Sequence, residues 1–315
     1  MLSFEREISA LEADGRLDGA TAARLRSIER REIFSVYPEL RALSWAGVML
    51  VVAGVGVLVG KNLDRIGPLT LAAAIAVASA ACYAYALWRR KSATASLVDD
   101  YVLLLGALLL SADLGYIEVQ FELLEHGWPR YLLLLAFVHG AGAYFFESQA
   151  LLALSISAVA SWIGIEQRPT RALDLLFAHH IETAARTYAC AAIVFAWRVV
   201  DQRVRAAREF APVFDHFVAN FALFASLVLV FDRPYRLAGA ILTLIAAAAV
   251  VTYGMRKRSE VFVLYAYGYA VIAVDVLVVT HLRAGTDALL FLVVSTIAAI
   301  VGLFVLHGVY RSRTS

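Results

Sequence analysis

The sequence predicts an all-α fold: a polytopic transmembrane helix bundle of about ten spans, with a short N-terminal cytoplasmic helical hairpin. Of its 315 residues, 61% are hydrophobic and only 17% are charged, which is far from the composition of a soluble globular domain. The hydrophobic residues occur in runs of about 20, the length that crosses roughly 30 Å of hydrocarbon as a helix. Because these runs are continuously apolar rather than alternating, they favour helices over a β-barrel.

The segment 1–41 is predicted to form the hairpin. Residues 3–14 and 19–37 are compatible with helices, Gly15 separates them, and Asp18 is placed to cap the second one. The segment carries eight acidic residues and seven arginines, so a solvated surface is favoured over an amphipathic anchor on anionic lipid. Docking of a cytoplasmic protein partner is the functional alternative for this segment.

Ten apolar segments follow the hairpin and form the predicted bundle over residues 42–310. They lie near 42–60, 67–88, 101–121, 129–146, 149–165, 175–197, 211–231, 234–255, 261–281 and 287–309. With ten crossings, the connections on the side of both termini hold 19 Lys and Arg residues and those on the opposite side hold eight. The positive-inside rule therefore places both termini in the cytoplasm, with 311–315 as a cytoplasmic tail.

The fourth and fifth segments are short, and their number of crossings decides the topology. If they formed one helix, the split of positive residues would fall to 15 against 12, so two separate spans are favoured. A shallow re-entrant hairpin in their place would keep the same orientation elsewhere. That alternative stays open.

The chain also shows a faint internal similarity. The stretch DRIGPLTLAAAIAVASAACYAYALWRRKS, from Asp64, can be aligned with DRPYRLAGAILTLIAAAAVVTYGMRKRSE, from Asp232. Both have Asp-Arg, a proline, an Ala-rich span, a tyrosine near the inner end and a basic triplet. Since both run from outside to inside, a true duplication would be a parallel repeat. The alternative is the common composition of Ala-rich spans, and the sequence does not decide between the two.

Ionisable side chains within the predicted spans are the candidates for a functional site. On an insertion scale, a charged group at mid-membrane costs about 2.5 to 3.5 kcal/mol, so such groups normally face the bundle interior and find partners. His179, Glu182 and Arg186 follow i, i+3, i+7 and share one face of a helix. The proposed intramembrane polar cluster, near mid-depth or in the outer half, consists of Asp113, Glu118, His139, His179, Glu182, Arg186 and Asp275.

Two hypotheses explain this cluster. In the first, it lines an outward-facing polar cavity of a transporter or permeation protein that takes a proton, a cation or a small polar solute, with Arg186 as a counter-ion or anion contact. In the second, the groups neutralise one another in a non-transporting membrane scaffold or envelope sensor whose N-terminal hairpin docks a partner. Access of water to the cluster distinguishes the two, because a scaffold needs no cavity.

Other function classes have less support. The sequence contains no His-Glu-x-x-His motif, nucleophile elbow or phosphate-binding loop, so we assign no catalytic residue and no cofactor, and an embedded enzyme is the least favoured class. We assign no metal site, since adjacent His179 and His180 point about 100° apart on a helix. A net charge of +2 does not suggest nucleic acid. Cys82 and Cys190 fall inside apolar segments and are expected to be free thiols.

Two stretches resemble a known family. These are LEADGRLDGATAARLRSIE, from Leu11, and WAGVMLVVAGVGVLVGKNLDRIGP, from Trp45. Together they resemble the uncharacterised bacterial membrane proteins of domain-of-unknown-function family 2157, mainly over the segment 1–70, although Leu63 stands where the family pattern has tryptophan. The resemblance implies a protein of the bacterial cytoplasmic (inner) membrane. It supplies no catalytic residues.

Overall fold

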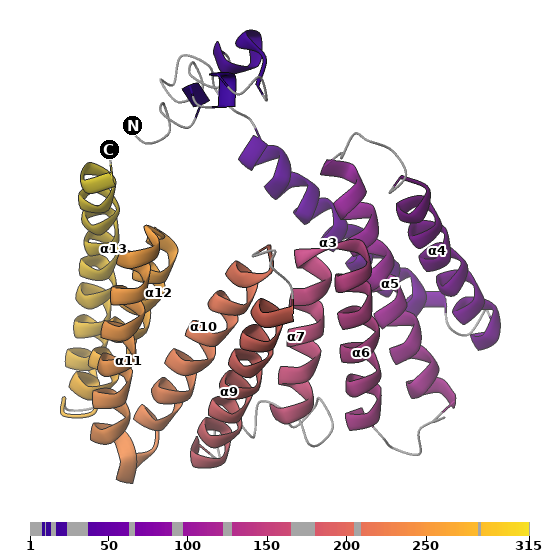
Figure 1. The fold of residues 1–315 in the computed structure, drawn as a ribbon. Helices are drawn as coiled ribbons and strands as arrows, with labels where there is room; N and C mark the ends of the chain where they lie inside the picture. The colour runs from indigo at the N-terminus through magenta and orange to yellow at the C-terminus, as the bar shows by residue number, and fades with distance from the viewer. Residues whose placement is uncertain are drawn as a thin grey trace.

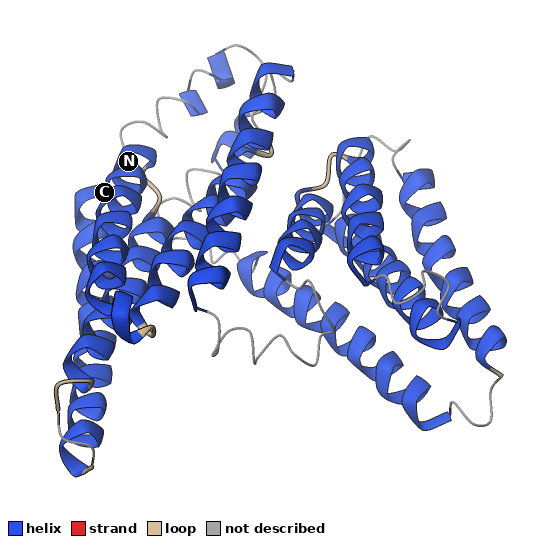
Figure 2. Ribbon diagram, turned by 90° about the horizontal axis from the view of Figure 1, so that it is seen from below, coloured by secondary structure: helices blue, strands red, loops and turns tan. Residues whose placement is uncertain are grey.

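A computed structural model of the chain describes residues 8–9, 11–13, 17–23, 37–62, 67–89, 97–121, 128–164, 180–204, 209–282 and 285–314. Throughout this part of the chain the regular secondary structure is helical, which confirms the predicted all-α class (Figure 1; Figure 2). The long helices are α3 (Tyr37–Asn62), α4 (Pro68–Arg89), α5 (Leu97–Phe121), α6 (Trp128–Phe146), α7 (Gln149–Gly164), α9 (His180–Val204), α10 (Ala211–Val230), α11 (Arg236–Lys257), α12 (Glu260–Val279) and α13 (Thr286–Thr314), and a 3-10 turn, η2 (Arg233–Tyr235), precedes α11.

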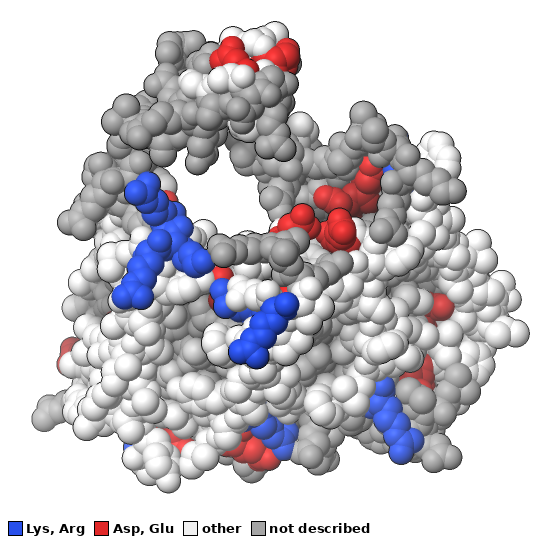
Figure 3. Space-filling model, in the orientation of Figure 1, with Lys and Arg blue, Asp and Glu red and all other residues white. Residues whose placement is uncertain are grey.

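Each predicted span coincides with one of these helices, and several are suited to a bilayer. Within the described residues, six are long and apolar enough to cross a membrane, namely those in α4, α5, α10, α11, α12 and α13. The α6 and α7 helices are apolar but shorter, and α9 carries charged residues along its length. In Figure 3 most Lys, Arg, Asp and Glu side chains lie towards the two ends of the bundle, which leaves a largely uncharged band between them. The chain is therefore a membrane protein with several apolar helices.

Four helices extend at least four residues beyond the spans predicted from hydropathy, among them α5, which begins at Leu97. The α3 helix begins at Tyr37, α9 continues to Val204 and α13 continues to Thr314. In each case polar and charged residues continue the helix beyond the apolar run. Hydropathy marks where a segment enters lipid, whereas the backbone hydrogen bonds of a helix continue until a cap or a turn ends them.

Neighbouring helices run antiparallel, so their ends alternate. Arg89 at the end of α4 contacts Asp99 at the start of α5, and Glu260 at the start of α12 contacts His307 near the end of α13. We call the end at which α4, α6, α9, α11 and α13 finish the predicted cytoplasmic end, after the positive-inside count, and the opposite end the predicted outer end. Between α6 and α7 the chain reverses at Glu147, which has a positive φ of 57°.

The bundle has two halves, α3 to α7 and α9 to α13, with α4 and α13 at opposite edges in Figure 1. The largest hydrophobic cluster joins the halves near the predicted cytoplasmic end. Its buried residues are Ala86, Leu103, Ala107, Ala143, Leu151, Leu152, Ile156, Cys190, Val194, Phe210 and Phe214. Close approach of α4 and α5 depends on Gly106, where a Cβ atom would lie 2.8 Å from Cβ of Cys82.

The α13 helix lies against α12 and is otherwise exposed. Along its 29 residues, about 44 Å, Ser295 donates a hydrogen bond to Asp275 and the backbone oxygen of Ala299 accepts one from Tyr267. His307 contacts Glu260. Its outward face carries large exposed apolar side chains, which suit contact with lipid: Leu289, Leu290, Val293, Val294, Ile297, Ile300, Val301, Phe304 and Val305.

Most of the predicted N-terminal hairpin lies outside the described residues. Of its described part, residues 8–9, 11–13 and 19–23 are helical, and the side chains of Ile8 and Ala22 are buried. Asp18 accepts hydrogen bonds from the side chain and backbone of Thr21 and the backbone of Ala20, which lowers the pKa of its carboxyl group. These are the contacts of an N-cap, as predicted for Asp18.

Candidate functional site

The predicted site residues differ in burial. Asp113, Glu118 and His139 are 4%, 6% and 2% exposed, whereas Glu182, Arg186 and Asp275 are not fully buried. His179 lies outside the described residues. Since burial of an ionisable group is costly unless it is paired, the three buried groups of α5 and α6 define the candidate site.

His139 of α6 bonds to Ser111 of α5. Its Nε2 lies 2.7 Å from Oγ of Ser111, and that hydroxyl donates its proton to the carbonyl of Ala107 at 2.9 Å. Because the Ser111 hydroxyl gives its proton to Ala107, it is free to accept from the imidazole, an arrangement that needs a proton on Nε2 of His139. Nδ1 of His139 is buried and has no hydrogen-bond partner in the described part of the chain.

Small residues make room for further polar contacts around His139. The hydroxyl of Tyr131 donates to the carbonyl of Ser111, and a Cβ atom at Gly115 would come within 3.0 Å of that hydroxyl. On the other side of α6, Oγ of Ser155 in α7 donates to the carbonyl of Ala136 at 2.6 Å. The α5, α6 and α7 helices thus share a buried polar core.

Asp113 lies on the opposite side of α5 from Ser111. Two residues along a helix correspond to about 200°, and Leu109, Asp113 and Tyr116 follow i, i+4, i+7 on one face. Leu109 and Tyr116 pack against the apolar residues Leu71 and Ile75 of α4. Among the described residues, neither Oδ1 of Asp113 nor the Tyr116 hydroxyl has a hydrogen-bond partner. Asp113 is a buried carboxylate in an apolar stripe.

The remaining predicted residues have partners elsewhere. Glu182 accepts a hydrogen bond from Arg186 at 2.5 Å within α9, with the Glu182 side chain 52% exposed. Asp275 accepts one from Ser295 of α13 at 2.6 Å. The structure thus places the cluster members in different interfaces, and for Glu182, Arg186 and Asp275 the contacts are those of structural pairing.

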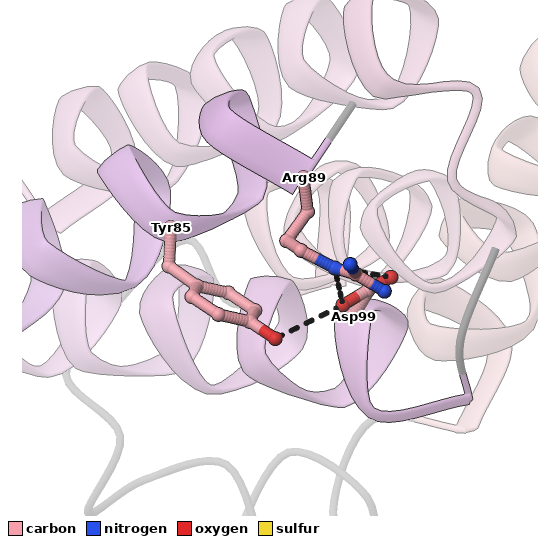
Figure 4. Close-up of polar contacts among 3 residues, drawn as sticks. All are labelled: Tyr85, Arg89 and Asp99. Carbon is pink, nitrogen blue, oxygen red and sulfur yellow. Dashed lines mark hydrogen bonds and ion pairs between the residues drawn. The ribbon is translucent and has the colours of Figure 1, made fainter. Parts of the chain in front are cut away.

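Sequence analysis missed two Tyr-Asp-Arg groups at the predicted cytoplasmic end. In the first clasp, Asp99 accepts from Tyr85 at 3.2 Å and from Arg89 at 3.1 Å (Figure 4). In the second clasp, Asp215 of α10 pairs with Arg198 of α9 and accepts from the Tyr253 hydroxyl of α11. Asp99 lies in the first turn of α5, beside α4 with Arg89 in its last turn, and this was the signal available for the first clasp. Asp215 and Arg198 lie farther inside their helices, so the second clasp left no such signal.

Metal chemistry has no support from the described residues, since no group of three or more His, Cys, Asp or Glu side chains there could hold an ion. The two cysteines are free, Cys190 buried and Cys82 partly buried, as predicted.

A comparison with known protein families gives a match over the first half of the chain. Residues 9–152 match the model of a family described as a predicted membrane protein (DUF2157), which confirms the resemblance and extends it past the segment 1–70. The matched segment includes Asp113, Glu118, His139 and the first clasp. Neither curated proteins nor solved structures yield a match to this chain.

Proposed function

We propose that this chain, whose residues 9–152 match a family of predicted membrane proteins, is a transport or permeation protein that carries protons through its α4–α6 region. Asp113 is the exchanging carboxylate, and His139 is a second exchanging group on the other side of α5. The polar core around Ser111 and Tyr131 keeps His139 in place.

The observation that supports this proposal is the unpartnered oxygen of Asp113. A charged carboxylate near mid-membrane costs about 2.5 to 3.5 kcal/mol, and a purely structural aspartate recovers that free energy by pairing. This chain has such pairs, in Asp275 with Ser295 and Glu182 with Arg186. Asp113 is more deeply buried than these, yet its Oδ1 lacks a partner among the described residues. A group that binds and releases a proton needs such a free oxygen.

The proposal includes the topology of ten crossings, with both termini in the cytoplasm of a bacterial inner membrane. The antiparallel order of the helices supports it, and α6, at 19 residues or about 28 Å, nearly spans the hydrocarbon. The α7 helix, at 16 residues or about 24 Å, is shorter. Glu147→Cys at the exposed turn between them tests this: labelling by an impermeant reagent from the cytoplasmic side supports two crossings, and protection from both sides supports a re-entrant hairpin.

Proton flux into proteoliposomes tests the function. Vesicles with an internal pH-sensitive dye and an imposed potassium diffusion potential should acidify faster with the protein than without it. Asp113→Asn, which keeps the shape and removes the exchangeable proton, should slow this flux at least about tenfold. Asp275→Asn is the matched control and should leave the flux nearly unchanged, because Asp275 already has a partner in Ser295.

The competing function is a non-transporting scaffold or envelope sensor. Its support is the N-terminal segment, in which the buried side chains of Ile8 and Ala22 indicate a small folded element available to a cytoplasmic partner. A scaffold carries no protons. If the protein adds no flux to that of empty vesicles, or if Asp113→Asn retains the full flux, the transport proposal fails and the scaffold is favoured.

A further inference from the structure

A seam of aromatic and polar contacts joins the two halves at the predicted cytoplasmic end. Nε1 of Trp197 in α9 donates to the hydroxyl of Tyr144 in α6 at 2.8 Å. The Tyr144 ring packs edge-on to Phe210 at 5.3 Å between centroids, and Trp197 packs edge-on to Phe214 at 5.5 Å. Gln149 adds a second hydrogen bond, from its Nε2 to the carbonyl of Glu209 at 2.9 Å.

The seam continues inward along one face of α9. Cys190, Val194 and Trp197 follow i, i+4, i+7, and Cys190 and Val194 are 2% and 0% exposed. They belong to the largest hydrophobic cluster, the one cluster among the described residues that contains residues of both halves. Near the start of α9, by contrast, Ile181 is 49% exposed. The aromatic and hydrogen-bonded contacts between the halves therefore lie at the predicted cytoplasmic end, while the apolar packing of the cluster continues along α7 to Ile163.

Each half is tied within itself at this same end. The first clasp joins α4 to α5, and the second clasp joins α9, α10 and α11. The ion pairs hold helices together inside a half, whereas the described contacts across the seam are apolar and aromatic packing with hydrogen bonds between neutral groups. A movement of the halves along the seam therefore separates apolar surfaces and leaves both clasps intact.

We propose that this seam is the cytoplasmic gate of the transport path, and that it opens when α9 and α10 move as a unit away from α6 and α7. The inference rests on the proposed transport function. In the structure the seam is closed. Opening it gives water at the predicted cytoplasmic end a route along the face that carries Trp197, Val194 and Cys190, beside the helix that bears His139.

The native Cys190 thiol reports on this opening. In a Cys82→Ala background, inside-out membrane vesicles are treated with an impermeant maleimide, and the rate of Cys190 labelling is measured. Tyr144→Phe combined with Gln149→Ala removes both hydrogen bonds across the seam and keeps the aromatic rings. Loss of even one such bond should raise the open population, and with it the labelling rate, about tenfold.

Tyr85→Phe is the matched control. It removes a tyrosine hydroxyl at the same end of the bundle, but one whose bond lies within a single half. This variant should leave Cys190 labelling at the rate of the parent protein, and right-side-out cells should show no acceleration for any variant. Tyr144→Phe alone keeps the ring packing and should accelerate Cys190 labelling less than the double variant does. If the double variant does not fold, this single variant takes its place in the test.

Two results would overturn the gate. One is unchanged labelling of Cys190 in both seam variants, and the other is equal acceleration by Tyr85→Phe, which would indicate general loosening. The measurement needs no transport. Failure of the proposed function appears as flux that does not depend on Asp113, whereas failure of the gate appears as labelling that does not depend on Tyr144.

Discussion

The two clasps have the same chemistry but different reach along the chain. In the first, the partners of Asp99 are 10 and 14 residues away, within one helical hairpin, and the Arg89 and Asp99 side chains are 23% and 19% exposed. In the second, the partners of Asp215 are 17 and 38 residues away, on two other helices, and the Arg198 and Asp215 side chains are 15% and 12% exposed. The first closes a local hairpin and the second fixes a tertiary arrangement.

The comparison also bears on the internal similarity. Tyr85 and Tyr253 occupy the same aligned position, at equal separation from the aspartate that begins each segment, Asp64 or Asp232. The internal similarity therefore puts a tyrosine hydroxyl, which can donate a hydrogen bond, at corresponding positions of α4 and α11. However, Tyr85 donates forward to α5 and Tyr253 donates backward to α10. If the alignment is continued without gaps beyond these stretches, the position of Asp99 corresponds to Tyr267, which has no carboxylate, so the two halves use the same donor differently.

The largest effect is expected from Asp215→Asn. This change leaves the Arg198 guanidinium largely buried without its counter-charge and Tyr253 without its acceptor, and it should lower the free energy of unfolding by about 3 kcal/mol. Denaturation by SDS titration measures the loss. A loss below about 1 kcal/mol would show that the second clasp is solvated like an ordinary surface pair.

Asp99→Asn should have a smaller effect in the same assay. The Arg89 and Asp99 side chains are more exposed than their counterparts, and water can replace part of the lost interaction. Added salt should narrow the difference between this variant and the parent protein, because exposed ion pairs are screened. If Asp99→Asn destabilises the protein as much as Asp215→Asn, the distinction between a local and a tertiary clasp fails.

The next largest losses of stability are expected from removal of the tyrosine hydroxyls of the two clasps. Tyr253→Phe removes one hydrogen bond to a charged group and should cost about 1.5 kcal/mol, the lower end of the range for such bonds. Tyr85→Phe should cost less, since its bond of 3.2 Å is at the long end of the normal range. Thermal unfolding of the two variants side by side gives the ranking, and the reverse order would contradict it.

The smallest effect is expected from Glu182→Gln. Its pair with Arg186 is an exposed i, i+4 contact within one helix, and such pairs contribute about 0.3 to 0.5 kcal/mol. Flux and stability should both stay close to those of the parent protein. If Glu182→Gln greatly reduced the proton flux without changing the stability, Glu182 would have to be counted among the residues of the transport path.

The fold could be predicted from the sequence because membrane helices appear as continuous apolar runs. All the predicted spans correspond to helices, and Asp113, Glu118 and His139 are buried in the bundle, while their role as a site stays a prediction. The number of membrane crossings stays a prediction. The ends of α9 and α13 were placed too early, since polar residues such as Arg203 and Arg313 extend both helices beyond the apolar run.

The partners of the site residues could not be predicted. Which faces meet depends on the rotation of each helix about its axis, and helices that are apolar nearly all round carry little information on rotation. The spacing of Ser111 and Asp113 already predicted that they point to opposite sides of one helix. It did not predict that α6 packs against one of these sides and α4 against the other. For the same reason, the hydrogen bond from Ser295 to Asp275 could not be predicted, because the rotation of α12 and α13 was unknown.

The α13 helix shows what a lipid environment does to tolerance of mutation. Lipid chains solvate apolar side chains as well as a neighbouring helix does, so polar contacts and close packing determine where α13 docks. Its outward face can exchange one apolar residue for another with little consequence. Gly302 cannot change so freely, because a Cβ atom there would collide with the Tyr267 hydroxyl that bonds Ala299. In this helix Gly302, rather than any of the large apolar residues on the outward face, should tolerate the fewest substitutions.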